Sequence, residues 1–230
     1  MKRKIIYVMC ILVLTIIFLL VWNYKIAFSL NDEMKIGIID SDLSKSSKDL
    51  DIISAENVTF SKEAHTHGDE MIKFLRDLNQ EAEIYYYNAE EQEKIRTETI
   101  IDGLNWMKVN GIKYVNVSLS GKRKNKELEK WIDANYPTIK VYASYNNQLN
   151  TYDYPAGYEK AIGSGTDPRI EWGENDRKYR SNKILVLPAL NQYAGNSYLS
   201  LLSLISDYEL GCYHEAYRKY EHPLWKRSFS

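Results

Sequence analysis

Cysteine is nearly absent from this chain of 230 residues, which holds only Cys10 and Cys212. Cys10 lies in an apolar run near the N-terminus and Cys212 lies near the C-terminus, so we do not expect the two thiols to come within disulfide distance. The sequence therefore offers no disulfide framework, which excludes the small, cross-linked class of secreted domains. An exported chain without disulfides is more typical of a bacterial surface protein.

An excess of charge of either sign is also missing. The 30 basic and 31 acidic side chains give a formal net charge of -1 at pH 7, so the composition does not indicate nucleic acid or an anionic lipid surface as a partner. No internal repeat or low-complexity linker interrupts the chain. Apolar residues make up 44% of the sequence, which is ample for the core of one domain with a small appendage.

Long hydrophobic runs are absent except for one near the N-terminus. Lys2-Arg3-Lys4 precedes an uncharged, apolar run from Ile5 to Trp22, close in length to the roughly 20 residues that cross a bilayer. Because the basic residues come first, the positive-inside rule predicts residues 1–4 in the cytoplasm, a transmembrane helix over 5–22, a tether over 23–34 and the rest outside the cell membrane.

A cleaved signal peptide is the alternative for this run. The apolar part of such a peptide is usually about 7–15 residues long and ends at a small-x-small site, whereas the run here is longer and Ala27-Phe28-Ser29 is only a weak cleavage site. The pattern favours an uncleaved signal-anchor. We therefore expect a single-pass protein of a Gram-positive-type bacterium, with its folded domain over 35–210.

Short apolar strands alternate with amphipathic helices from Lys35 onward. The helical segments carry apolar residues three or four apart, as Ile100, Leu104 and Met107 do, whereas the strands are short β-branched or aromatic runs. This alternation predicts an α/β domain of three layers, a mostly parallel sheet with helices on both faces. The strands are expected at 35–39, 82–87, 112–121, 139–144, 161–165 and 184–188, and the helices at about 67–78, 92–109, 127–134 and from 198.

Four polar side chains stand where these elements begin or end. Asp40 and Asn146 each follow a strand, at the sheet edge where parallel α/β folds collect ligands and catalytic groups. His67 begins a helix, and Ser197 lies in the Gly195–Leu199 turn that opens another, where backbone N–H groups face developing negative charge. Each also has an ordinary structural explanation, because Asp and Asn favour turns and Ser and Asn favour helix caps.

Metal binding is an alternative for the first two histidines. His65 and His67, with Asp69 and Glu70, could supply two imidazoles and a carboxylate, a familiar set of zinc ligands. The histidines are expected on an extended segment and the acids on the helix behind it, and no other cluster of histidine or cysteine lies nearby to complete a site. We therefore predict no metal and, because no cofactor motif is present, no organic cofactor.

The order Asp40, His67, Asn146, Ser197 resembles that of the subtilisin-like serine peptidases. Segments around all four residues are similar to motifs of that family, and the resemblance extends from Lys35 to about Leu210. The matching segments are Ile38-Ile39-Asp40-Ser41, His67-Gly68, Ile101–Gly121, Ala143–Asn146, Tyr154-Pro155-Ala156 and Gly195-Asn196-Ser197.

The resemblance implies a subtilisin-like fold and acyl transfer on a peptide or protein substrate. Ser197 would be the nucleophile, His67 the general base and Asp40 the residue that orients the imidazole, while the Asn146 side chain and the Ser197 N–H would bind the oxyanion. The expected function is therefore a membrane-anchored, extracytoplasmic serine endopeptidase. An extended substrate would pair as an added strand with the backbone of Ser118, Leu119, Ser120 and Gly121.

The chain departs from the family pattern beside each of these residues, so the alternative is a catalytically inactive protein of the same fold that binds a peptide or partner at the membrane surface. The departures are as follows: Asp42 and Tyr145 replace Gly, Asp69-Glu70 replaces Thr-His, Asn196 replaces Thr, and Leu199 and Leu201 replace Ala and Pro.

Residues 211–230 are expected to form a helix broken at Pro223, with an aromatic face packed on the domain.

Overall fold

The computed structural model describes residues 34–56, 58, 60–91, 94–147, 153–166, 175–178 and 193–217. The predicted anchor at 5–22, its flanks at 1–4 and 23–33, the predicted strand at 184–188 and residues 218–230 lie outside this part of the chain. Within the described part, no helix combines the length and the apolar character that crossing a membrane requires.

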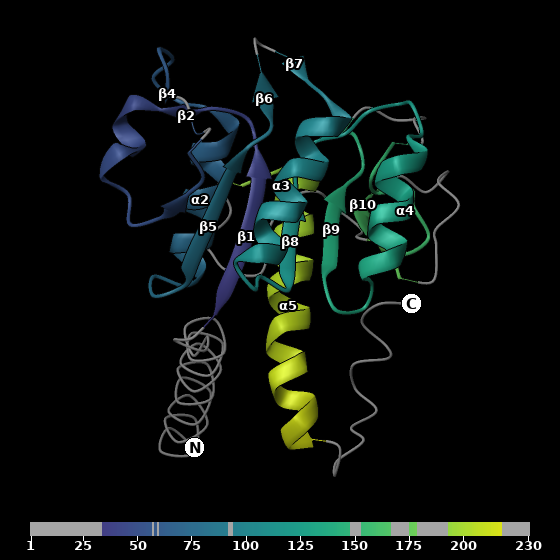
Figure 1. Cartoon of the computed structure of the whole chain (residues 1–230). Coiled ribbons are helices and arrows are strands. Elements are labelled where there is room, and N and C mark those ends of the chain that lie inside the picture. The colour runs from purple at the N-terminus through teal and green to yellow at the C-terminus, as the bar shows by residue number, and fades with distance from the viewer. Residues whose placement is uncertain are drawn as a thin grey trace, which may run out of the picture.

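One sheet forms the centre of the molecule (Figure 1). Its seven strands lie in the order β11-β10-β9-β8-β1-β5-β3, and every pair of neighbours is parallel. Parallel strands with both faces covered are expected to be nearly continuous apolar runs. The strands are β1 (Lys35–Asp40), β3 (Ile53–Ser54), β5 (Glu83–Asn88), β8 (Tyr114–Val117), β9 (Lys140–Ser144), β10 (Ile162–Gly165) and β11 (Arg177–Lys178).

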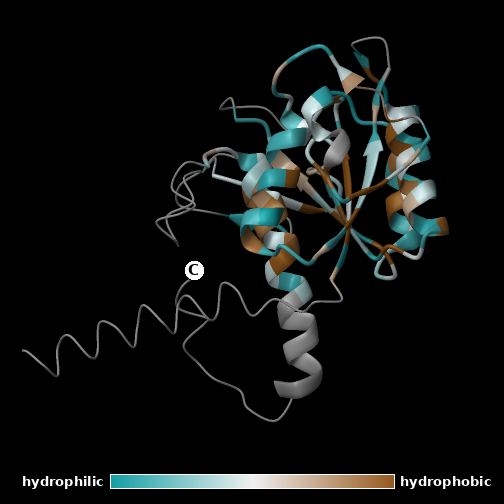
Figure 2. Ribbon diagram, turned by 90° about the vertical axis from the view of Figure 1, so that its left-hand side faces the viewer, coloured by the Kyte–Doolittle hydropathy of each residue, from teal (hydrophilic) through white to brown (hydrophobic). Residues whose placement is uncertain are grey.

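Helices cover both faces of the sheet, as the alternation of elements predicts. The helices α2 (His67–Leu78) and α5 (Asn196–Tyr217) pack on one face, and α3 (Thr97–Val109) and α4 (Lys126–Asn135) pack on the other. Figure 2 shows helices on either side of the strands, with hydrophobic residues on their inner sides. The predicted three-layer α/β architecture is therefore confirmed.

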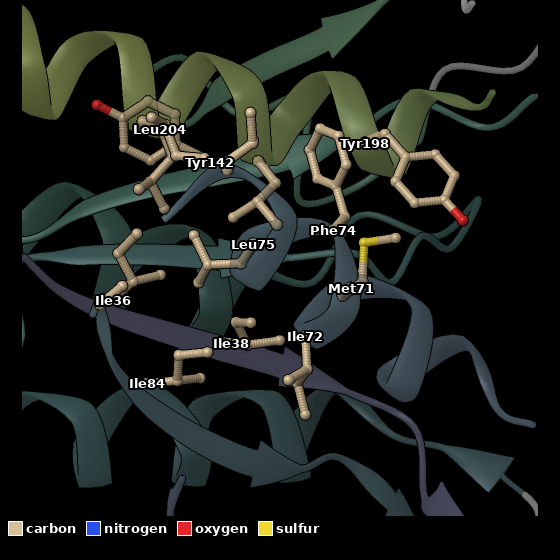
Figure 3. Close-up of a cluster of buried hydrophobic side chains, with 14 of the residues drawn as sticks. Ile36, Ile38, Met71, Ile72, Phe74, Leu75, Ile84, Tyr142, Tyr198 and Leu204 are labelled. Carbon is tan, nitrogen blue, oxygen red and sulfur yellow. The ribbon is translucent and has the colours of Figure 1, made fainter. Parts of the chain in front are cut away.

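Two large buried clusters of the described residues fill the spaces between the layers. One lies between the sheet and the helices α2 and α5 and contains Phe74 and Tyr142, neither of which has exposed surface (Figure 3). The other, on the side of α3 and α4, contains Ile100, Leu104 and Met107, the residues that the helical spacing predicts on one face. Burying a large apolar side chain stabilises a fold by about 1.5–3 kcal/mol, so these clusters hold the helices in place.

The structure differs from the sequence-based elements around residue 92. The helix expected from Gln92 begins at Thr97, because β6 (Glu90–Glu91) and β7 (Lys94–Ile95) first pair as a short antiparallel ribbon. This ribbon is mostly charged, and its composition gives no strand signal. The strand expected over 112–121 spans only residues 114–117.

Besides β3, three short elements lie between β1 and α2 in the described part of the chain. They are β2 (Leu43–Ser44), the 3-10 helix η1 (Lys45–Asp49) and β4 (Phe60–Ser61), and β2 pairs in parallel with β4. At the other end of the domain, α5 continues without a break through residue 217. The domain boundary expected after residue 210 therefore falls inside a helix.

The position of β1 in the sheet determines where the candidate residues meet. The chain leaves β1 for β5 on one side and later returns to β8 on the other. In open α/β sheets, ligands bind beyond the carboxyl ends of the strands where the direction of winding changes in this way. Asp40 is the last residue of β1 and therefore lies at that edge.

Gly68, in the first turn of α2, tests how closely this helix lies on the sheet. A Cβ atom at Gly68 would collide with the hydroxyl of Tyr86, so Gly68→Ala should lower the free energy of unfolding by about 1–3 kcal/mol through overpacking. Gly121→Ala is the matched control, because a Cβ there meets nothing within 4 Å. Urea denaturation measures both variants, and equal midpoints would contradict the close approach of α2.

Candidate active site

The carboxylate of Asp40 is fully buried at the end of β1. Its Oδ1 accepts a hydrogen bond from the backbone N–H of Ser41 at 2.7 Å, and both of its oxygens lie 2.9 Å from Nδ1 of His67. A buried carboxylate needs such partners, because removing its charge from water is costly unless hydrogen bonds replace the solvent. The structure therefore joins Asp40 and His67 as a pair.

His67 is the first residue of α2, and the local sequence determines where that helix starts. The side chain of Thr66 accepts from the N–H of Asp69 at 3.3 Å, and the Asp69 carboxylate accepts from the N–H of Thr66 at 2.8 Å. This reciprocal arrangement is a capping box. Because Nδ1 of His67 faces Asp40, the other ring nitrogen, Nε2, is left to exchange a proton with a third group. The His67 side chain is 39% exposed.

The two carboxylates near the imidazole raise the pKa of His67 above its usual value. Burial is the largest influence and acts in the opposite direction, because it disfavours the charged ring. The charge and hydrogen bond of Asp40, with a contribution from the charge of Glu70, outweigh burial. The site therefore stabilises the imidazolium that forms when His67 accepts a proton.

The acids at the start of α2 make separate contacts. Asp69 accepts hydrogen bonds from the backbone N–H of Ser44 at 3.1 Å and from the hydroxyl of Ser47. Burial favours the neutral form of Asp69, but these bonds outweigh it and lower the pKa of the carboxyl. Glu70 instead accepts from the hydroxyl of Tyr198. In the described ranges, no three His, Cys, Asp or Glu side chains lie close enough together to hold a metal ion, and this includes His65, His67, Asp69 and Glu70.

Ser197 lies in the first turn of α5. The turn before it requires Gly195, whose φ of 144° is a conformation that other residues rarely adopt. The carbonyl of Gly195 accepts the N–H of Leu199 at 3.4 Å as the first bond of the helix. Among the described residues, no hydrogen bond joins the hydroxyl of Ser197 to the imidazole of His67; such catalytic bonds often tighten only when substrate binds.

Asn146 follows β9, and Asn196 holds its backbone against the start of α5. The side-chain amide of Asn196 donates to the carbonyls of Tyr145 at 2.9 Å and Asn146 at 3.1 Å, and its backbone N–H donates to Oδ1 of Asn147 at 2.8 Å. The backbone N–H of Asn146 donates to Asp153 at 3.0 Å. The residue before the candidate nucleophile thus fixes the segment that carries the candidate oxyanion donor.

A buried asparagine connects α5 to the predicted substrate edge. Asn116, on β8, is fully buried. Its Oδ1 accepts from the hydroxyl of Ser200 at 2.7 Å, and its amide donates to the hydroxyl of Ser118 at 2.5 Å. Ser200 lies one turn after Ser197, so the predicted edge begins beside the helix of the candidate nucleophile.

The remainder of that edge leaves the sheet. Leu119 is buried, Ser120 is exposed, and Gly121 exchanges two backbone hydrogen bonds of 2.9 Å with Tyr154. In the described part of the chain, Leu119 and Ser120 make no backbone hydrogen bond to another segment.

Several contacts of the site are not apparent from the sequence. An Asn in the apolar strand β8 was the available signal for Asn116, because a buried polar side chain requires a partner. The sequence gives no such signal for the contacts of Asn196 or for the bond between Tyr198 and Glu70. Asp42, which departs from the family pattern, accepts a hydrogen bond from the amide of Asn88 at 2.5 Å.

The sequence is similar to that of a curated subtilisin. No family model matches the chain. Among curated proteins, the chain is similar to subtilisin DY of Bacillus licheniformis, with 23% identity over 194 residues that cover 73% of this chain and 70% of that protein.

Solved subtilisin-like proteases share the fold. The self-cleaved protease domain of PatA matches with a TM-score of 0.57 at 11% identity, over 75% of this chain and 77% of that domain. The psychrophilic subtilisin-like protease Apa1 of the Antarctic Pseudoalteromonas sp. AS-11 matches with a TM-score of 0.50 at 17% identity, over 60% of this chain. This chain covers only 38% of Apa1, so the likeness concerns a shared fold and not the whole of that enzyme.

The contact with Asp40 predicts how His67 titrates. By NMR, the pKa of His67 should lie above the usual value of about 6.5, and Asp40→Asn should lower it because the negative charge is removed. A raised pKa in the folded protein contributes stability below the unfolded pKa, and that contribution is lost as the pH rises through the folded pKa. In Asp40→Asn this loss of stability above about pH 6.5 should be smaller.

Glu81→Gln provides the control for this titration, because it removes an exposed acid beyond the far end of α2. The pKa of His67 should be the same in Glu81→Gln and in the wild-type protein. A pKa that stays unchanged in Asp40→Asn would contradict the described pairing.

Proposed function

We propose that this chain, a divergent member of the subtilisin-like family, is a serine endopeptidase that hydrolyses peptide bonds through Asp40, His67 and Ser197. The observation that carries the proposal is the contact of Nδ1 of His67 with both oxygens of the buried Asp40 at 2.9 Å. A histidine oriented by a buried carboxylate, with its second nitrogen available, has the arrangement of a general base. Ser197 opens the helix that packs beside α2.

In the proposed reaction, the Ser197 oxygen attacks the carbonyl carbon of a peptide bond while Nε2 of His67 takes the hydroxyl proton. Collapse of the tetrahedral intermediate breaks the C–N bond, and the imidazolium gives its proton to the leaving amine. Water then attacks the acyl-enzyme by the same route, which releases the carboxylic acid and restores the serine. Asp40 remains ionised, accepts the Nδ1–H bond and stabilises the imidazolium.

The oxyanion that forms in each step requires hydrogen-bond donors. In this proposal they are the backbone N–H of Ser197, which lies among the N–H groups that have no partner within the helix, and the side-chain amide of Asn146. The bond from Asn196 to the Asn146 carbonyl at 3.1 Å supports their proximity. Losing one such donor typically lowers kcat about 100- to 1,000-fold.

The proposed substrate is an extended peptide that pairs with the backbone edge of Leu119 and Ser120. The link through Asn116 and Ser200 supports this, because it places the start of the edge beside α5. Backbone pairing would hold the peptide in an extended form without selecting its side chains.

The proposal also includes a location. Residues 5–22 would anchor the chain in the cell membrane with residues 1–4 in the cytoplasm and the catalytic domain outside. The support is the basic segment Lys2-Arg3-Lys4 followed by the uncharged run from Ile5 to Trp22.

Fractionation of cells tests the anchor. The full chain should be recovered with membranes, resist extraction by high salt and dissolve in detergent, because burial of the apolar run holds it in the bilayer. External protease should digest it in intact cells. A variant that lacks residues 5–22 serves as the control, and recovery of the full chain in the soluble fraction would contradict the anchor.

A fluorophosphonate probe tests the proposed activity without knowledge of the substrate. The oxygen of an activated serine displaces fluoride from the probe's phosphorus, and the base takes the proton. The full chain in detergent should be labelled, whereas Ser197→Ala and His67→Ala should lose labelling. Ser54→Ala, which changes an exposed serine of β3, should be labelled like the wild type. A folded wild type that stays unlabelled would favour the inactive, peptide-binding alternative.

A further inference from the structure

One hydrogen bond links the helix of the proposed base to the helix of the proposed nucleophile. The hydroxyl of Tyr198 donates to Oε2 of Glu70 at 2.7 Å. Tyr198 is the residue after Ser197 on α5, and Glu70 lies three residues after His67 on α2, which places Glu70 on the same side of that helix. The bond therefore joins a residue next to Ser197 to a residue one helical turn from His67, and these two groups must meet in the proposed reaction.

Aromatic contacts fix the direction of the Tyr198 ring. Tyr198 is 8% exposed, and its ring packs against Phe74 with centroids 5.2 Å apart at 69° and against Tyr193 with centroids 5.1 Å apart at 49°. Phe74 lies four residues after Glu70, so α2 presents the carboxylate and this ring on one face. Figure 3 shows Phe74 reaching toward α5 and the Tyr198 hydroxyl directed away from the buried cluster.

The hydroxyl has a role that packing alone does not explain, because phenylalanine would fill the same space. Burial, together with the hydrogen bond and charge of Glu70, raises the pKa of Tyr198. The hydroxyl therefore keeps its proton and remains the donor throughout the range in which a histidine titrates. A bond to an ionised acceptor is about twice as strong as a neutral one.

The charge of Glu70 also acts on the proposed base. The charged groups that act on His67 in the described structure are Asp40, from β1, and Glu70, from its own helix, and both favour the protonated ring. Tyr198, the residue of α5 that bonds to Glu70, is neutral. The ammonium of Lys73 bonds to Asp77 at 2.7 Å and to the Tyr193 hydroxyl at 2.8 Å, so its charge is directed to partners other than Glu70.

We propose that Glu70 and Tyr198 are a positioning pair that sets the placement of Ser197 relative to His67 and tunes the basicity of the imidazole. The inference rests on the proposed function. Glu70 stands where the family pattern has histidine, so the pair belongs to the departures of this chain. In this account, the hydrogen bond fixes α2 and α5 relative to each other at the point of reaction, and the carboxylate assists Asp40 in stabilising the imidazolium.

Tyr198→Phe tests the positioning role, because it keeps the ring and the charge of Glu70 but removes the hydrogen bond. The limiting rate of labelling by the fluorophosphonate probe at saturation should fall about 3- to 30-fold, since small misplacements of reacting groups are costly. The concentration of probe that gives half the limiting rate should change by less than about twofold. The pH at which the rate is half-maximal should stay the same, because the charges around His67 are unchanged.

Glu70→Gln tests the electrostatic role, because its amide oxygen can still accept the bond from Tyr198 but carries no charge. The acidic limb of the rate profile should move to lower pH by about 0.3–1 unit, since loss of a nearby negative charge lowers the pKa of His67. Salt should reduce the difference between this variant and the wild type. An NMR titration of His67 should show the same shift.

Tyr193→Phe is the matched control. Tyr193 belongs to the same aromatic cluster, but its hydroxyl bonds to Asp77 and Lys73 further along α2. The limiting rate and the pH profile should stay at wild-type values. A fall equal to that of Tyr198→Phe would show a general loosening of the contact between α2 and α5 and would overturn the positioning role.

The outcomes separate this inference from the function on which it rests. An unreactive, folded wild-type protein overturns the proposed function and, with it, the placement of Ser197 for reaction. A reactive wild type with unchanged rates in Tyr198→Phe and an unchanged profile in Glu70→Gln overturns the pair alone. In either case, an NMR pKa of His67 that does not fall in Glu70→Gln overturns the electrostatic role.

Discussion

The candidate site depends on one interaction, the contact between the buried carboxylate of Asp40 and Nδ1 of His67 at 2.9 Å. Asp40 has no exposed surface, so its charge is tolerated only because His67 and the N–H of Ser41 replace its hydration. That requirement couples the end of β1 to the start of α2. The capping box between Thr66 and Asp69 also fixes the start of this helix. The backbone of His67 is therefore held by the helix start, and its ring is held by Asp40.

A second set of buried polar groups joins the rest of the site to α5. Asn196 holds the backbone around Asn146, and Asn116 bonds to both Ser200 and Ser118. Such networks favour a single arrangement, because each member left without a partner would be costly inside the protein. Two departures from the family pattern form hydrogen bonds of their own: Asp42 accepts from the amide of Asn88, and Asn196, which replaces a threonine, donates to the carbonyls of Tyr145 and Asn146. The altered residues thus have structural roles of their own.

Local patterns predicted the fold well, because strand and helix signals depend on neighbours in the sequence. The strand before Asp40, the helix that begins at His67 and the buried stripe of Ile100, Leu104 and Met107 were all confirmed. The ribbon of β6 and β7 was missed, since pairing rather than composition defines its charged residues as strands. The resemblance supplied Asp40 and His67 as partners, and their side chains are in contact in the structure. Contacts such as Tyr198 with Glu70 join residues 128 positions apart, and a single sequence does not reveal which polar groups meet across such distances.

The proposed reaction requires Ser197 to be the nucleophile that His67 activates. This role is tested by mass-spectrometric mapping of the residue that carries the phosphonyl group after reaction of the full chain with a fluorophosphonate. We expect one adduct per chain, on Ser197, formed more slowly as the pH falls and His67 becomes protonated. An adduct on another side chain, such as the hydroxyl of Ser118 or Ser200, or a rate that does not depend on the titration of His67, would contradict it.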